Sequence, residues 1–440
     1  MLLLVLLLTI SSLSNCYNHN NNNRIIISSL YSSTTSIPFI EDKINAQRFH
    51  HVELYCGDAT STYKRFILGL GMDMIAKSDL STGNNIHASY ALQSGQMTML
   101  FTAPYSISSS LSSTSSPLPG FDCSVATDFF TKHGLGVRAV CIEVEDVYKA
   151  YETIMLNKGK SVLPPQQIYD HDKSKGYIDL AEVSLYGDVV LRLINSSGFK
   201  GNFIPNFNDI KTCNLDKLEN SYGLTRFDHV VGNLWALEPA MSALKEMTGF
   251  HEFAEFVADD VGTVDSGLNS VVLANKDEMV LLPLNEPTFG TKRKSQIQTY
   301  LEQNKGEGVQ HMALFTPNIF DTLQKMKAAT RWGGLEFMDP QPKSYYRNIR
   351  NRIGDSLTDD QYEMIEKLGL LADKDDKEGI LLQIFTKPIG DRPTLFLEII
   401  QRIGCVDKGG QQKAGCGGFG KGNFRDLFKS IEDYEKTLKL

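Results

Sequence analysis

The chain has 440 residues, more than one hydrophobic core usually supports, so its length predicts two or three domains. Hydrophobic residues make up 42% of the chain and charged residues 22%, which excludes a wholly disordered or wholly membrane-embedded protein. The 44 basic and 52 acidic residues give a formal net charge of −8, and no basic stripe with interleaved aromatics is present, which excludes a nucleic acid as the main partner.

Residues 1–46 differ in composition from the rest of the chain. An apolar run from Leu2 to Ile10 is followed by Ser/Asn-rich sequence through Asn23 and by a Ser/Thr-rich stretch at 28–36. The apolar run is too short to cross a bilayer, so no membrane span is expected in the mature protein. The pattern favours a targeting presequence that is cleaved, and a disordered extension is the alternative.

Residues 47–200 are predicted to form a first module of strands and helices. We expect strands at 49–55, 88–92, 97–102 and 190–194, a helix at 59–68, and a strand that leads into a helix within 136–147. A Ser-rich stretch at 108–116 is predicted to be a surface loop, and residues 201–223 are expected to link this module to the next.

Residues 224–440 are predicted to form a second module. We expect strands at 227–234, 270–274, 279–284, 309–316, 381–386 and 394–400, and helices at 237–247, 319–330, 359–368 and 423–438. The last of these helices has one apolar face and follows a glycine-rich stretch at 415–422 that lacks the phosphate-binding pattern. We therefore interpret the stretch as a hinge before a lid helix.

Seven cysteines stand at positions 16, 56, 123, 141, 213, 405 and 416, and no two of them form a CxxC pair. This spacing indicates neither a disulfide framework nor a zinc ribbon. A reducing compartment is therefore expected for the mature protein.

An internal repeat relates the two modules. RFHHV at 48–52 recurs as RFDHV at 226–230, an offset of 229 − 51 = 178 residues, which implies a duplicated unit. GVRA at 136–139 parallels GVQH at 308–311, and VLRLI at 190–194 parallels FLEII at 396–400. These alignments place Ala139 opposite His311 and Arg192 opposite Glu398.

The repeat predicts a metal site in the second module. His229, His311 and Glu398 stand on three separate strands, where alternation can aim them at one point. Two imidazoles and one carboxylate form the facial triad typical of non-haem Fe(II) oxygenases. A histidine in an apolar strand more often packs in a core, but a carboxylate inside an apolar strand is costly to bury without a cation. Because the first module has His51 but neither of the other ligands, one iron per chain is expected.

The motifs RFDHVVGN, GEGVQHMALFT, LLQIFTKP, GDRPTLFLEIIQRIG and GCGGFGKGNF resemble those of 4-hydroxyphenylpyruvate dioxygenases. The resemblance runs from about Gln47 to the C-terminus and includes plant-like stretches such as KSDLSTGN and FTAPYS. It implies an α+β fold of two tandem vicinal-oxygen-chelate domains built from βαβββ modules. The second domain would form an open β-barrel around iron, with the C-terminal helix as a lid.

The resemblance also implies the site residues. Fe(II) would be held by His229, His311 and Glu398. Substrate contacts are implied at Ser270, Asn285, Gln296, Gln310, Gln383, Phe385, Phe396, Asn423 and Phe424, with Gln296 and Gln310 orienting the substrate. As the neighbour of His311, Gln310 should point to the opposite face, so its role requires a bulge or a strand end. The alternatives are strand-edge hydrogen bonding for the glutamines and core packing for Phe385 and Phe424.

The reaction implied by the resemblance is the conversion of 4-hydroxyphenylpyruvate and O₂ to homogentisate and CO₂, in tyrosine catabolism or quinone precursor supply. The close alternative is a hydroxymandelate synthase, and the alternative of another class is a metal-free binding protein on the same duplicated scaffold. A homodimer is expected from the family. The plant-like body favours delivery to a plastid by the presequence, with a cytoplasmic location as the alternative.

Overall fold

The computed structural model describes residues 42–105, 116–210, 221–256, 267–290, 292–375, 379–405 and 415–438, without the side chains of 424–428. Residues 40–440 belong to one compact unit. Most of the expected presequence, the Ser-rich loop up to residue 115 and residues 211–220 of the expected linker lie outside the described residues. None of the described helices is long and apolar enough to cross a membrane.

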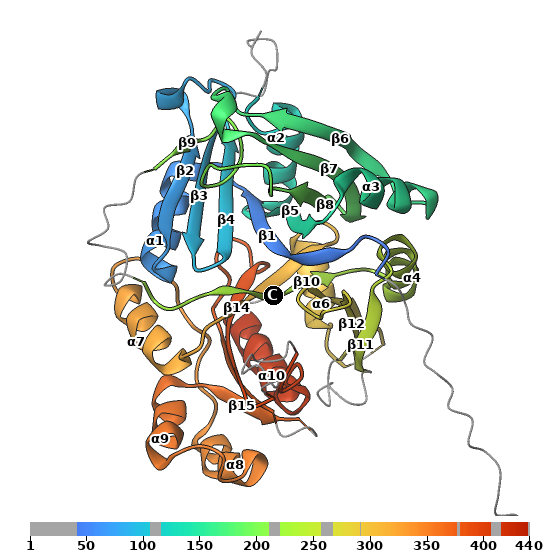
Figure 1. The fold of residues 1–440 in the computed structure, drawn as a ribbon. Helices are drawn as coiled ribbons and strands as arrows, with labels where there is room; N and C mark the ends of the chain where they lie inside the picture. The colour runs from blue at the N-terminus through green and yellow to red at the C-terminus, as the bar shows by residue number, and fades with distance from the viewer. Residues whose placement is uncertain are drawn as a thin grey trace, which may run out of the picture. The chain divides into compact units, whose positions relative to one another are not determined.

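The first half of the described chain forms one mixed sheet with three α-helices (Figure 1). The strands are β1 (Ala46–Tyr55), β2 (Asp73–Ser78), β3 (His87–Ser94), β4 (Met97–Pro104), β5 (Gly136–Val144), β6 (Ser161–Tyr169), β7 (Tyr177–Tyr186), β8 (Val189–Asn195) and β9 (Asn208–Asp209). Their order in the sheet is β6-β7-β8-β5-β1-β4-β3-β2-β9. The helices are α1 (Ala59–Leu70), α2 (Cys123–His133) and α3 (Val147–Leu156).

The second half of the described chain forms another mixed sheet, in the order β11-β12-β13-β10-β14-β17-β16-β15. The strands are β10 (Arg226–Asn233), β11 (His251–Phe256), β12 (Leu268–Ala274), β13 (Leu281–Pro287), β14 (Gly308–Phe315), β15 (Leu371–Lys374), β16 (Ile380–Phe385) and β17 (Phe396–Ile403). The helices are α4 (Leu237–Thr248), α6 (Gln296–Gln303), α7 (Ile319–Thr330), α8 (Lys343–Ile353), α9 (Asp359–Leu368) and α10 (Lys421–Leu438).

The two sheets have the same connectivity, which confirms the duplication. β1 pairs in parallel with β4 and antiparallel with β5, and β10 makes the same two pairings with β13 and β14. β8 pairs in parallel with β5 as β17 does with β14. Arg192 is in register with Cys141, and Glu398 with Ala313, so the expected equivalence of Arg192 and Glu398 is confirmed.

The two sheets share one hydrophobic core. Phe49 of β1 and Phe227 of β10 meet edge to face with ring centroids 6.0 Å apart. At the ends of the sheets, the Asn275 side-chain amide donates to the carbonyl oxygen of Ala46 at 2.7 Å. Helices α3 and α4 also contact each other. The first module therefore supports the second through a continuous buried interface.

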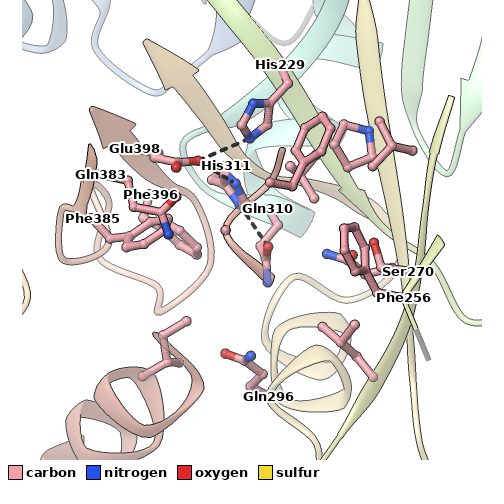
Figure 2. Close-up of a pocket in the computed structure, with 18 residues that line it drawn as sticks. His229, Phe256, Ser270, Gln296, Gln310, His311, Gln383, Phe385, Phe396 and Glu398 are labelled. Carbon is pink, nitrogen blue, oxygen red and sulfur yellow. Dashed lines mark hydrogen bonds and ion pairs between the residues drawn. The ribbon is translucent and has the colours of Figure 1, made fainter. Parts of the chain in front are cut away.

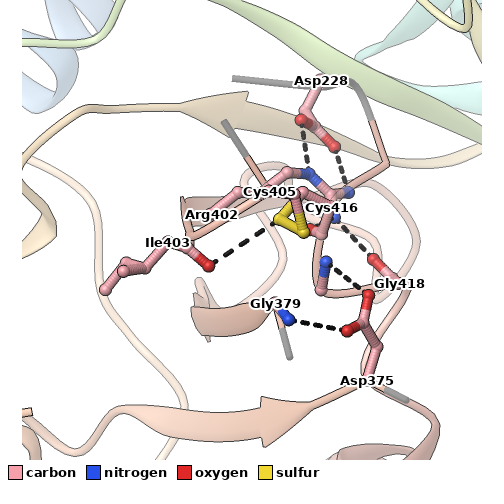
Figure 3. Close-up of a disulfide and its surroundings, with 9 residues drawn as sticks. Asp228, Asp375, Gly379, Arg402, Ile403, Cys405, Cys416 and Gly418 are labelled. Carbon is pink, nitrogen blue, oxygen red and sulfur yellow. Dashed lines mark hydrogen bonds and ion pairs between the residues drawn. A yellow bond between two sulfur atoms is a disulfide. The ribbon is translucent and has the colours of Figure 1, made fainter. Parts of the chain in front are cut away.

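A disulfide joins Cys405, just after β17, to Cys416 in the loop before α10 (Figure 3). The scattered cysteine spacing did not indicate this pair. The free cysteines among the described residues are Cys56, Cys123 and Cys141, all buried. The disulfide ties the glycine-rich loop to the strand that carries Glu398.

Candidate active site

The expected metal ligands meet at one point. β10, β14 and β17 are neighbours in the second sheet and carry His229, His311 and Glu398 (Figure 2). A carboxylate oxygen of Glu398, Oε2, lies 3.1 Å from Nε2 of His229 and 3.4 Å from Nε2 of His311. All three side chains are buried, and their ligand atoms lie within 4.8 Å of one another.

The hydrogen bonds of the two histidines set their tautomers. Nδ1 of His229 lies 2.9 Å from Oδ2 of Asp228, and Nδ1 of His311 lies 2.9 Å from Oε1 of Gln310. Because both oxygens accept, each Nδ1 carries the hydrogen and each Nε2 presents a lone pair to the shared point. Two neutral imidazole nitrogens and one carboxylate fit the donor set that Fe(II) requires.

The charge of the site also favours a cation. Burial alone would raise the pKa of Glu398, but the adjacent His229 and His311 lower it to about 2. For His229, burial acts to lower the pKa, yet Asp228 and Glu398 raise it above its usual value. The ionised carboxylate of Glu398 beside two imidazole nitrogens therefore favours a bound cation.

Two β-bulges place the supporting side chains beside the ligands. Between β10 and β14 the register passes from the pair Phe227 and Leu314 directly to His229 and Ala313, which leaves Asp228 as the extra residue. Further along, the pair Val231 and His311 is followed by the pair Gly232 and Val309, so Gln310 is the extra residue on β14. The bulge that a site role for Gln310 requires is therefore present. Alternation alone would have turned Asp228 and Gln310 away from the histidines.

A cavity adjoins the three ligands, and all three line it. Most of the expected substrate contacts line it: Ser270, Asn285, Gln296, Gln310, Gln383, Phe385 and Phe396. Phe396 stacks on His311 with centroids 4.9 Å apart, and Phe385 meets Phe396 edge on. Oε1 of Gln296 is buried and has no hydrogen-bond partner among the described residues, so it can accept from a bound hydroxyl group.

Two expected contacts, Asn423 and Phe424, are not among the described residues that line the cavity. Asn423 does not line the cavity, because its Oδ1 accepts hydrogen bonds from Tyr345 at 3.1 Å and Arg352 at 2.9 Å. The side chain of Phe424 lies outside the described residues, so its role as a substrate contact stays a prediction. Phe419 and Gly420 of the loop before α10 and Ile431 of α10 line the cavity instead.

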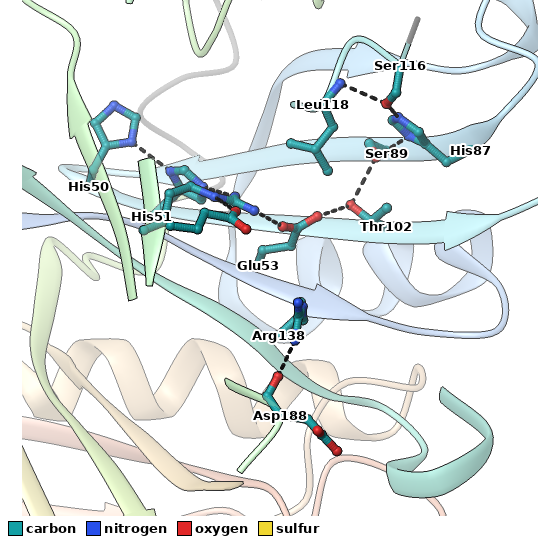
Figure 4. A network of polar contacts seen from close by, with 12 residues as sticks. His50, His51, Glu53, His87, Ser89, Thr102, Ser116, Leu118, Arg138 and Asp188 are labelled. Atoms are coloured by element: carbon teal, nitrogen blue, oxygen red, sulfur yellow. Dashed lines mark hydrogen bonds and ion pairs between the residues drawn. The ribbon is translucent and has the colours of Figure 1, made fainter. Parts of the chain in front are cut away.

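In the first module, charged side chains occupy the position equivalent to the metal site (Figure 4). The buried Arg192 guanidinium donates to Nε2 of His51 at 2.9 Å, to Glu53 at 2.7 Å and to Glu182 at 2.7 Å. Glu53 corresponds to the cavity residue Val231, since 53 + 178 = 231. In the first module the Arg192 guanidinium thus takes the place of a metal cation, and the charged Glu53 stands where the second module has the apolar Val231.

His50, His51 and Cys141 also lie close enough together to be considered as metal ligands. However, His51 accepts from Arg192 at Nε2, so its Nδ1 carries the hydrogen and faces Nδ1 of His50 at 2.8 Å. Burial holds the pKa of His51 well below its usual value, which keeps this ring neutral. No lone pair of His51 therefore faces the cluster, and a second iron site is not expected here.

Gly420 is expected to tolerate no side chain. Its φ is +72°, and an added Cβ would stand 2.9 Å from Nε2 of Gln383. Gly420→Ala should displace the Gln383 amide and raise the substrate KM about 10-fold, with iron affinity unchanged. Gly290→Ala is the matched control, because Gly290 has φ +78° and nothing within 4 Å. Equal KM values for the two variants would show that the contact with Gln383 is irrelevant.

The docking of α10 is expected to weaken as pH rises. Burial raises the pKa of Glu435 to about 7, and the neighbouring carboxylate Glu432 adds to the effect while Arg293 and Lys294 of the segment before α6 oppose it. The pKa of Glu435 is higher in the folded protein than in the unfolded chain. The stabilisation that protonated Glu435 gives to the docked helix is therefore complete below about pH 4.5 and is lost as the pH rises through about 7. Amide exchange of α10 should accelerate over this range in the wild type and much less in Glu435→Gln. The same pH profile in both proteins would contradict this.

Comparison with known proteins agrees with the geometry. The chain is 55% identical over 403 residues to 4-hydroxyphenylpyruvate dioxygenase from Daucus carota, covering 90% of this chain and 89% of that protein. It is 53% identical over 409 residues to the enzyme of that name from Arabidopsis thaliana, covering 90% of each. No protein-family model matches the chain.

Among solved structures, a mutant of 4-hydroxymandelate synthase from Streptomyces coelicolor matches with a TM-score of 0.71 and 20% sequence identity. The match covers 89% of this chain and 100% of that one. At this identity the likeness shows the fold alone, and it confirms the tandem α+β architecture.

Proposed function

The chain belongs to the 4-hydroxyphenylpyruvate dioxygenase family and is an Fe(II)-dependent dioxygenase, and we propose that its second module converts 4-hydroxyphenylpyruvate and O₂ to homogentisate and CO₂. The observation that carries the proposal is the convergence of His229, His311 and Glu398 beside a largely apolar cavity. In this reaction the side chain loses CO₂, one oxygen atom enters the ring and the other enters the new carboxylate.

His229, His311 and Glu398 would hold Fe(II), which when bound would supply the oxidation chemistry between a 2-oxo acid and O₂. The protein's contribution is to bind, orient and exclude water. Phe385 and Phe396 provide apolar aromatic walls for the substrate ring. The unpartnered oxygen of Gln296 can accept the phenol hydrogen, and Gln310 keeps His311 in the ligating tautomer.

Product analysis tests this proposal. The protein is loaded with Fe(II) without oxygen, mixed with 4-hydroxyphenylpyruvate and then exposed to O₂. Homogentisate with release of CO₂ is the expected product. Hydroxylation at the benzylic carbon would instead identify a hydroxymandelate synthase, and binding of the 2-oxo acid without turnover or iron would identify a binding protein. Either result would refute the proposal.

We further propose that the enzyme is a homodimer, on the strength of its family. Light scattering of the purified protein tests this, and a monomeric mass would refute it. We also propose that residues 1–46 direct the chain to a plastid, supported by the apolar run, the Ser/Thr-rich stretch and the identity to plant enzymes. A reporter fused to residues 1–46 that stays diffuse in the cytosol would refute this location.

A further inference from the structure

Arg402 connects two parts of the site that are distant in sequence. It lies on β17 four residues after Glu398, so alternation places both side chains on the same face of the strand. Its side chain is fully buried. Nε donates to Oδ1 of Asp228 at 3.0 Å and Nη2 to Oδ2 at 2.7 Å, a bidentate pair (Figure 3).

The same guanidinium holds the loop before α10. Nη1 donates to the carbonyl oxygens of Cys416 at 2.5 Å and Gly418 at 2.6 Å. The group also lies under Phe419, with Cζ 5.5 Å from the ring centroid. Phe419 in turn meets the His229 ring edge on, with centroids 5.2 Å apart. Arg402 therefore supports both the ring that covers His229 and the carboxylate that orients it.

The repeat provides an internal control for this connection. The offset between Glu398 and Arg192 is 398 − 192 = 206, so Arg402 corresponds to Ser196, and Asp228 corresponds to His50. Ser196 bonds to Glu143 at 3.0 Å. At the positions equivalent to Arg402 and Asp228, the first module therefore has neither a guanidinium nor a carboxylate.

We propose that Arg402 is a positioning residue that couples metal binding at His229 to the order of the loop at residues 415–420. Asp228 Oδ2 is shared by Nδ1 of His229 and Nη2 of Arg402, so a metal that fixes the His229 ring also fixes the carboxylate that anchors the guanidinium. Thermodynamic linkage requires the converse, that an ordered loop strengthens metal binding. The inference rests on the proposed iron site.

The test compares amide exchange of residues 415–420 with and without Fe(II), in the full chain and without oxygen. In the wild type, Fe(II) should slow exchange in this loop. Arg402→Lys keeps a cation beside Asp228 but cannot span both the carboxylate and the two loop carbonyls. We expect this variant to lose the iron-dependent protection and to bind Fe(II) about 10-fold to 100-fold more weakly, the range typical of groups that support a metal ligand.

Arg226→Gln is the matched control. Arg226 also pairs with Asp228, at 3.3 Å, but is partly exposed, so this variant should keep the iron-dependent protection. If Arg402→Lys does not fold, Phe419→Leu tests the same link from the loop side and should reduce the protection.

The inference would be overturned if a folded Arg402→Lys or Phe419→Leu variant kept the full iron-dependent protection from amide exchange. It would also be overturned if Fe(II) did not change amide exchange of residues 415–420 in the wild type. A wild type that binds no Fe(II) would instead refute the proposed function. These two failures are distinguishable, because the first leaves wild-type iron binding and homogentisate formation intact.

Discussion

Glu398→Gln is expected to lower Fe(II) affinity by far more than about 100-fold and to abolish turnover, while the fold is kept. Loss of a group that merely supports a ligand costs about 10-fold to 100-fold in metal affinity, and loss of a charged ligand costs more. The substitution preserves the shape of the side chain but removes the negative charge that offsets the cation. Titration of the metal-free protein with Fe(II) measures the change.

Glu53→Gln is the matched control for this experiment. Glu53 is a buried carboxylate on β1 that bonds to Arg192 rather than to the metal ligands. Its replacement should reduce stability yet leave iron stoichiometry unchanged. Turnover with normal iron content in Glu398→Gln would remove Glu398 from the ligand set.

Arg192→Met is expected to destabilise the protein by about 3–5 kcal/mol, because it leaves the carboxylates of Glu53 and Glu182 buried without their cation. Both carboxylates are almost completely buried. The iron ligands lie in the other sheet, so a folded fraction should still bind one Fe(II) per chain. Urea unfolding gives the change in stability.

The triple variant Arg192→Met, Glu53→Leu, Glu182→Leu distinguishes charge from packing. Replacing a whole buried ion-pair cluster by apolar side chains is often neutral or stabilising. The triple variant should therefore recover most of the stability that Arg192→Met loses. If Arg192→Met is as stable as the wild type, the guanidinium does not neutralise the buried carboxylates of Glu53 and Glu182.

Much of the fold could be predicted from the sequence, because its central strands alternate or are continuously apolar. The predicted strands at 49–55, 227–234 and 309–316 correspond to β1, β10 and β14 within a few residues. No strand was predicted at β6, where two prolines and a largely exposed edge obscure the alternation. No helix was predicted at α8, whose sequence is mostly polar or charged and whose buried residues are few.

The metal ligands could be predicted because the duplicated motifs and a carboxylate in an apolar strand leave a sequence signal. Asp228 has no such signal, since its position beside His229 depends on a bulge that alternation does not predict. Phe419 was missed for a different reason. It reaches the cavity because Arg402 and a disulfide draw the loop back to β17, a tertiary contact that no local pattern encodes.

Replacing each of the two histidines related by the repeat tests whether a single module holds the iron. His51→Ala and His229→Ala remove equivalent buried imidazoles from β1 and β10. Iron content and homogentisate formation are measured together on both variants, with circular dichroism to confirm folding. His51→Ala should retain one iron per chain and form homogentisate, whereas His229→Ala should bind iron much more weakly and form none. Iron retained with full turnover in His229→Ala, or iron lost from a folded His51→Ala protein, would contradict this prediction.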